Sequence, residues 1–179
     1  EKQRGPLEGR LGVDPLARAQ WFLNEYHDLL AIENPTADLQ LIRRSSDGMH
    51  LFFRQLHESV PLFAGQLAIH LDADSVLSLN GEYVPRIDVP SIPTLSPVLA
   101  EQVALAAGNG GDAVVGDTQL RYVDLGLLGL ADGATYLTWQ VHVGRQGSLA
   151  KLETIFVDAF KGSIVFRVTN AADNHKPPL

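Results

Sequence analysis

The sequence predicts an α+β fold built from two tandem units, each with one helix packed on a small antiparallel sheet. Two observations lead to this prediction. A segment with apolar residues at helical spacing is followed by segments that alternate apolar and polar residues, and this order occurs twice. A stretch with four prolines between residues 85 and 97 separates the halves, and proline is rare inside central strands. We therefore expect domains at residues 14–84 and 96–170.

The first helix should begin at Asp14, whose side chain can cap it, with Pro15 in the first helical position. Apolar residues from Ala19 to Leu30 recur at the helical period and form one stripe. The helix is expected to end near Asn34-Pro35.

Three alternating segments after this helix predict antiparallel strands. Polar turn sequences, "SSDG" and "DADS", lie between them. The apolar positions that define the three strands are Leu39 and Leu41, then Met49, Leu51 and Phe53, then Leu67, Ile69 and Leu71.

The second unit repeats the order. Ser96 and Pro97 should start a helix that ends at "GNGG". Four strands are expected after it, in "LRYVDL", "YLTWQVHV", "KLETIFVDA" and "SIVFRV". Trp139 shares a strand face with apolar neighbours, so we expect it in the core, and Asp158 should bond to backbone N–H groups of the next turn. The apolar stripe of the helix is Leu99, Val103, Ala106 and Ala107.

Composition excludes several classes of function. The chain has 179 residues, a formal net charge of -7 and a pI near 5.2, which argues against a nucleic-acid or anionic-membrane partner. It contains no cysteine, so it has neither disulfides nor a thiolate nucleophile. No apolar run approaches the roughly 20 residues that span a bilayer, and the first residues lack the apolar core of a signal peptide. No cofactor is expected.

One stretch resembles the start of a zinc-peptidase motif. "RQLHESVPLFAG" opens with His57-Glu58, as HExxH does, but Pro61 stands where the second histidine belongs. The motif works only on a helix, where both imidazoles share a face, and proline at that position disfavours a helix. No other histidine has a partner at helical spacing. We therefore expect no catalytic residue and no metal ligand, and interpret the chain as a non-enzyme.

The residues resemble two known modules in tandem, over about residues 15–172. "FRQLHESVPLFAGQLAIHLDADSVLSLNGEYVP" is similar to the fungalysin/thermolysin propeptide (FTP) domain, although Ser59 and Ala64 stand where glycine is usual and Ser75 replaces a turn glycine. "TLSPVLAEQVALAA", "YLTWQVHV" and "FVDAFKG" resemble a PepSY domain, with Lys161 where threonine is common. The positions that match the FTP pattern are Arg54, Gln55, Val60, Pro61, Phe63, Gly65, Asp72 and Gly81.

This resemblance implies the pro-region of a secreted thermolysin-like zinc metallopeptidase, which acts as intramolecular chaperone and inhibitor of the catalytic domain. The catalytic domain is then the partner, and the chain is part of a zinc metalloendopeptidase precursor. The C-terminal tail should lie near the catalytic cleft, with Asn174, His175 and Lys176. The alternative is a non-catalytic secreted or envelope binding module that reuses the FTP–PepSY pair. The motif-matched residues expected to bind protein are Arg54, Gln55, Val60, Pro61 and Gly65.

Overall fold

The structure is a computed structural model that describes residues 14–108, 112–130, 133–145 and 151–171. The described residues divide into two compact units. The first unit lies within residues 1–87 and includes Leu127–Leu130, and the second lies within residues 88–126 and 131–179. In each unit helical residues pack on antiparallel strands, so the predicted α+β class is confirmed.

The first helix starts as predicted and ends earlier. Helix α1 spans Pro15–Glu25, and the Asp14 side chain accepts a hydrogen bond from the backbone N–H of Leu16. The predicted extension to Asn34 is wrong, because the chain leaves the helix at Tyr26 and reaches a positive φ of 54° at Ala31. This change of direction buries Ile32 and leaves Leu29 82% exposed.

A second, four-residue helix follows in the first unit, so the expectation of one helix per unit is wrong here. Helix α2 spans Pro35–Asp38, and the Asn34 side chain caps it by accepting from the backbone N–H of Ala37. Proline fits the first helical position because a backbone N–H at that position would have no partner within the helix, so its absence costs nothing. The sequence Asn-Pro therefore begins a helix here, although the pattern predicts that it ends one.

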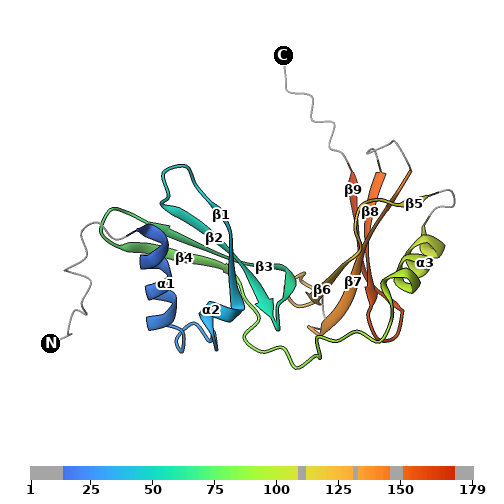
Figure 1. Ribbon diagram of the computed structural model, residues 1–179, viewed down its shortest axis with the longest axis horizontal. Helices are drawn as coiled ribbons and strands as arrows, with labels where there is room; N and C mark the ends of the chain where they lie inside the picture. Colours follow the sequence, from blue (N-terminus) through green and yellow to red (C-terminus); the bar gives the residue numbers. More distant parts are fainter. Residues whose placement is uncertain (1–13, 109–111, 131–132, 146–150, 172–179) are drawn as a thin grey trace, which may run out of the picture. The chain divides into compact units, whose positions relative to one another are not determined.

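Four strands form the sheet of the first unit in the part of the chain that the structure describes. β2 pairs with β1 on one side and with β3 on the other, and β4 pairs with the edge of β3 away from β2, all antiparallel. Helices α1 and α2 pack on one face of this sheet (Figure 1). The strands are β1 (Leu39–Arg44), β2 (His50–His57), β3 (Val60–Leu71) and β4 (Val76–Glu82).

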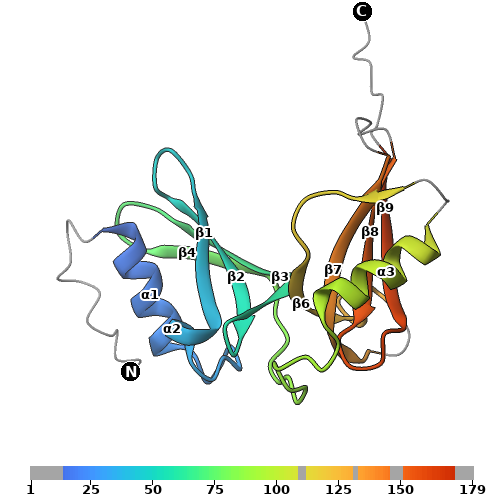
Figure 2. The same cartoon turned by 45° about the vertical axis from the view of Figure 1, so that its right-hand side comes forward.

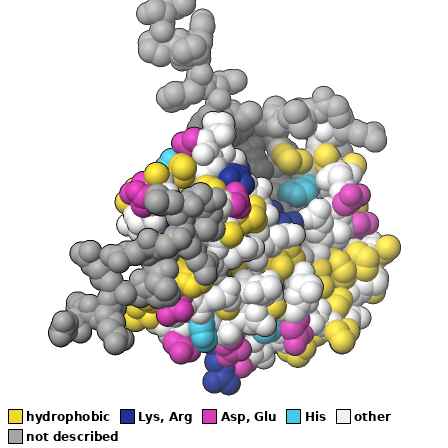
Figure 3. All heavy atoms as spheres, turned by 60° about the vertical axis from the view of Figure 1, so that its left-hand side comes forward, with side chains coloured by type: hydrophobic (Ala, Val, Ile, Leu, Met, Phe, Trp, Pro, Cys, Tyr) yellow, Lys and Arg dark blue, Asp and Glu magenta, His cyan; other side chains and the backbone are white. Residues whose placement is uncertain are grey.

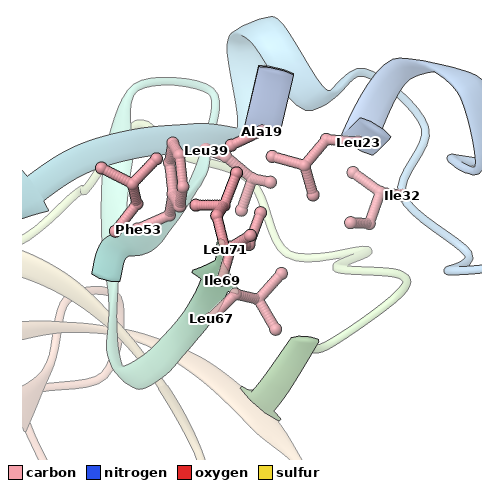
Figure 4. Close-up of a cluster of buried hydrophobic side chains, with 9 residues drawn as sticks. Ala19, Leu23, Ile32, Leu39, Phe53, Leu67, Ile69 and Leu71 are labelled. Carbon is pink, nitrogen blue, oxygen red and sulfur yellow. The ribbon is translucent and has the colours of Figure 1, made fainter. Parts of the chain in front are cut away.

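The core of this unit lies between the helices and the sheet. Figure 4 shows Ala19 and Leu23 of α1 pointing toward side chains of the strands. Alternate residues of β3, Leu67, Ile69 and Leu71, supply the apolar face that the sequence predicted. Alternation works because successive strand side chains point to opposite faces of the sheet.

A bulge interrupts the pairing of β2 with β3. Arg54 pairs with Gln66, whereas Leu56 pairs with Pro61, so residues 62–65 lie opposite Gln55 alone. Ala64, in this bulge, has a φ of 64°. An L-residue with a positive φ is strained because its Cβ crowds the backbone. This position is one of those where the FTP pattern usually has glycine.

Glycine at position 64 should therefore stabilise the protein. Relief of about 1 kcal/mol of strain is partly offset by the greater freedom of glycine in the unfolded chain, so we expect Ala64→Gly to raise the free energy of unfolding by about 0.5 kcal/mol. Ala68→Gly, in the same strand but outside the positive-φ set, should lower it by about 0.5–1 kcal/mol. Urea unfolding of both variants tests this, and a loss of stability in both would contradict the strain argument.

The described residues of the second unit form one helix, which packs on its sheet. α3 spans Pro97–Ala107, and the Ser96 side chain accepts from the backbone N–H of Leu99, as predicted. The buried residues are Ala100 and Ala104. The predicted stripe is therefore wrong in part, since Leu99 is 49% exposed. Two small residues at this spacing allow the helix backbone to lie close to the sheet.

The sheet of this unit is antiparallel in the order β6–β7–β8–β9, and the two-residue strand β5 also pairs with β7. Figure 2 shows α3 against this sheet. β9 extends to Ala171, past the predicted end at Val168. The strands are β5 (Ala113–Val114), β6 (Gln119–Asp124), β7 (Thr135–Gly144), β8 (Lys151–Asp158) and β9 (Ile164–Ala171).

Two side chains of the second unit can be compared with their predicted positions. Trp139 packs at the margin of the core and donates from Nε1 to the carbonyl of Leu95 at 2.8 Å. The buried Asp158 accepts from the backbone N–H groups of Phe160 and Lys161 at 2.8 and 2.9 Å. The prediction for Asp158 is confirmed, whereas Trp139 is only partly buried and packs against the core from its margin. In the part of the chain that the structure describes, no helix is long and apolar enough to cross a membrane.

Candidate functional site

The sheet of the first unit has one face that neither helix of that unit covers, and we call it the open face. Strand pairing arranges its side chains in three rows, because directly paired residues of neighbouring strands point to the same side. The rows are Gln40–Arg54–Gln66–Glu82, Arg43–Phe52–Ala68–Asn80 and His50–His70–Ser78.

Basic and aromatic groups occupy the first two strands of the open face. The guanidinium carbon of Arg43 lies 3.6 Å from the centre of the Phe52 ring, which is a cation–π contact. Arg54 is half-buried in the next row. Arginine binds carboxylates through two parallel N–H groups. The open face can therefore hold carboxylates against an apolar ring.

Two histidines form the third row. The Nδ1 atoms of His50 and His70 are 2.6 Å apart, and the ring centres are 4.9 Å apart at an interplanar angle of 65°. Both side chains are half-buried. Asp47 lies in the preceding turn, where hydrogen bonds from the Ser45 hydroxyl and the Met49 backbone N–H, with a smaller contribution from His50, lower the pKa of its carboxyl.

The five residues predicted to bind protein do not meet at one site. Arg54 lies on the open face, but Gln55 points to the opposite side and is 2% exposed. Its amide Nε2 donates to the carbonyl of Val84 at 2.7 Å, and its Oε1 accepts from the Val84 N–H at 2.9 Å. Gln55 therefore holds the segment that follows β4 and is a structural residue.

Gly65 is also internal. A Cβ built at this position would lie 2.6 Å from Cδ2 of Leu62, which is itself buried. Glycine is needed because the Leu62 side chain packs over its α-carbon. Gly65 is thus a packing residue of the bulge and has no side chain that could reach a partner.

Val60 and Pro61 begin β3 at the end of a hairpin. Val60 pairs with His57 across a two-residue turn in which Glu58 and Ser59 have φ values of 46° and 68°. Positive φ at both central residues is the pattern of a type I′ turn. His57 and Pro61 thus lie on two different strands. The prediction that "HESVP" is not helical is confirmed, and the stretch has no zincin geometry.

The tail residues predicted to lie near a catalytic cleft, Asn174, His175 and Lys176, fall outside the described residues. Within the residues described, no group of three or more His, Cys, Asp and Glu side chains is arranged to hold a metal ion.

His142 lies on a strand of the second unit, and its Nδ1 contacts the Thr154 hydroxyl at 2.9 Å. Burial, together with the nearby charge of Arg121, lowers the pKa of its ring.

The surface charge fits the composition. Acidic side chains are scattered over the face shown in Figure 3, with basic and histidine side chains among them. The open face differs from this average, because its three rows contain two arginines and two histidines and only one acid, Glu82. It is the feature of the first unit that departs most clearly from an ordinary acidic surface.

Comparisons with known proteins show a distant likeness of fold. No family model matches the sequence, and no curated protein does. The C-terminal domain of Bacillus megaterium YpeB matches over 94% of this chain and 67% of that domain, with 16% identity and a TM-score of 0.43. A protein from Clostridium difficile 630 described as a lipoprotein matches over 91% of this chain and 97% of its own, with 15% identity and a TM-score of 0.31. Neither likeness supports an inference about function.

Proposed function

We propose that the chain is a non-catalytic protein-binding module of the FTP–PepSY type and that its open face binds an acidic, extended segment of a partner protein. The observation that carries this proposal is a basic sheet face, uncovered by the helices of its own unit, in a chain of net charge -7. An antiparallel sheet is stable with one polar face exposed to solvent. The open face is therefore free to bind a partner.

The chemistry of the open face favours carboxylates. Arg43 is held against Phe52 by the cation–π contact, so less side-chain entropy is lost when it binds a carboxylate. Arg54 lies one row away and provides a second guanidinium group that can bind a carboxylate. An extended segment with acids on alternate residues matches this spacing, since strand side chains on one face recur every second residue.

The family resemblance also supports a location outside the cytoplasm. The modules that the chain resembles belong to secreted peptidase precursors. We favour the hypothesis that this chain is a secreted or envelope protein in which the same two modules serve in binding. The lack of cysteine is compatible with this location, because disulfides are common but not required there.

A random peptide library tests the proposal and does not require a named partner. Peptides selected on the wild-type chain should be rich in Asp and Glu, and their affinity should fall at high salt because exposed charge pairs are screened. Arg43→Glu and Arg54→Glu should each weaken binding at least about tenfold, since like charges then oppose one another. Arg145→Glu, an exposed site in the second unit, is the matched control for net charge.

Two results would count against this docking surface. One is a set of selected peptides without acidic residues. The other is equal loss of affinity in the Arg145→Glu control, which would mean that the overall charge of the chain governs binding and the open face does not.

The pro-region of a thermolysin-like metallopeptidase is the second candidate. A specific observation favours it: in the described residues, β9 pairs only with β8, so its outer edge has no strand partner, and it leads directly into residues 172–179. A free strand edge can pair with an extended segment of a catalytic domain. Binding to the folded enzyme would stabilise it by mass action and exclude substrate.

Inhibition in trans distinguishes the two candidates. If the chain is a pro-region, it should inhibit the catalytic domain of a thermolysin-like peptidase, and a version ending at Ala171 should inhibit less. Truncation at Ala171 retains the whole of β9, so the fold is kept. Absence of inhibition by both versions would eliminate the pro-region and leave the binding module.

A further inference from the structure

The histidine pair of the open face has a geometry that strand pairing imposes. His50 and His70 are 20 residues apart in sequence and are direct partners in the β2–β3 ladder. Direct partners have Cβ atoms about 4.5–5.5 Å apart, which allows two imidazoles to meet at their Nδ1 atoms. A search for histidines at helical spacing cannot find such a pair.

The Nδ1 atoms of the two rings, 2.6 Å apart, can each act as a metal ligand. One ring must donate an N–H to the other as long as no cation is present, because two acceptors cannot bond. A cation bound to one side of the line that joins them, with both rings turned toward it, would replace this proton and receive both lone pairs. Half-burial of both rings limits their motion and leaves one side open to solvent.

The separation of the nitrogens favours one class of cation. With metal–nitrogen distances of about 2.0 Å, two ligands at 90° are about 2.8 Å apart, whereas tetrahedral ligands are about 3.3 Å apart. The observed 2.6 Å needs a shift of about 0.2 Å for the first geometry and about 0.7 Å for the second, and both geometries also require the two rings to turn toward the cation. Square-planar and tetragonal sites of this kind bind Cu²⁺ and Ni²⁺.

The surroundings tolerate a positive ion. Asp47, whose carboxyl has a lowered pKa and interacts with His50, supplies negative charge from the neighbouring turn. Arg43 on β1 supplies positive charge in the adjacent row, and its contact with Phe52 holds it over that ring. On β4 the row continues with the uncharged Ser78.

We propose that His50 and His70 form a two-imidazole site for a divalent cation of the copper(II) or nickel(II) class, with water in the remaining positions. This proposal departs from the expectation from sequence that the chain has no metal ligand. The cation would clamp β2 to β3 on the open face. Two protein ligands make an exchangeable site, in contrast to the closed four-ligand sites of structural zinc.

Titration of the untagged protein with Cu²⁺, Ni²⁺ and Zn²⁺ tests the site. Calorimetry should show one Cu²⁺ per chain, with Cu²⁺ bound more tightly than Ni²⁺, and Ni²⁺ more tightly than Zn²⁺. Electron paramagnetic resonance of the Cu²⁺ form should show coupling to two equivalent nitrogens. His50→Asn and His70→Asn should each weaken Cu²⁺ binding by more than the roughly tenfold caused by loss of a residue that only orients a ligand.

Two controls make the outcome decisive. His142→Asn removes a half-buried strand histidine that faces a threonine, and it should leave Cu²⁺ binding unchanged. His175→Asn, in the tail, should also leave it unchanged. Equal Cu²⁺ affinity of the wild type, His50→Asn and His70→Asn would overturn the proposal, as would a wild-type spectrum with no nitrogen coupling. A wild-type spectrum without nitrogen coupling overturns the proposal even if a variant fails to fold.

Discussion

Replacement of Gly81 by alanine should lower the free energy of unfolding of the first unit by about 3 kcal/mol or more. Gly81 lies in β4 opposite Leu67 and has a φ of 133°. A Cβ at this position would lie 2.0 Å from the carbonyl oxygen of Gln66. Because that atom belongs to the backbone of β3, it cannot move aside without breaking the pairing of the two strands.

Gly129 provides the matched control for this prediction. It also has a positive φ, of 71°, but a Cβ there would meet nothing within 4 Å. Gly129→Ala should therefore cost only the strain of the left-handed conformation, about 1 kcal/mol. Denaturant unfolding followed by circular dichroism measures both. Equal losses in the two variants would show that the close approach of β3 to β4 at Gly81 is not rigid.

Loss of the Gln55 side-chain amide should be the second large effect. Gln55→Met keeps the volume of the side chain and removes both hydrogen bonds to Val84. Each backbone group left without a partner costs about 1–3 kcal/mol when it is shielded from water. We expect a loss of about 2 kcal/mol, measured by urea unfolding.

The control for Gln55 is Gln66→Met, on the neighbouring strand. Gln66 is exposed on the open face, so the change in stability should stay within about 0.5 kcal/mol. Wild-type stability in Gln55→Met would mean that the amide contributes nothing to the fold, and would restore Gln55 as a candidate for partner binding.

Local signals in the sequence predicted where helices begin. Asp14-Pro15 and Ser96-Pro97 pair a capping side chain with a proline, and both helices start there. The end of α1 had no such signal. The apolar stripe continues past Glu25, but the chain turns so that Ile32 can enter the core. Tertiary packing decides that end, and it is not visible in a periodic pattern.

Strand alternation predicts the place of Gln55, a structural residue, because it follows Leu51 and Phe53 at strand spacing and so lies on the core face. The histidine pair was harder to predict. The contact of His50 with His70 depends on the β2–β3 register, and the register depends on the bulge at residues 62–65. A bulge shifts every later pair, and composition does not reveal where it lies.

The central claim, that the open face of the first unit is the docking surface of a binding module, is tested most directly by mapping NMR chemical-shift changes. A selected acidic peptide is added to the isotope-labelled chain. The account predicts that the largest changes fall on Arg43, Phe52, Arg54 and the His50–His70 row, and that they disappear in Arg54→Glu. Changes confined to β9, or to residues of the second unit, would contradict it.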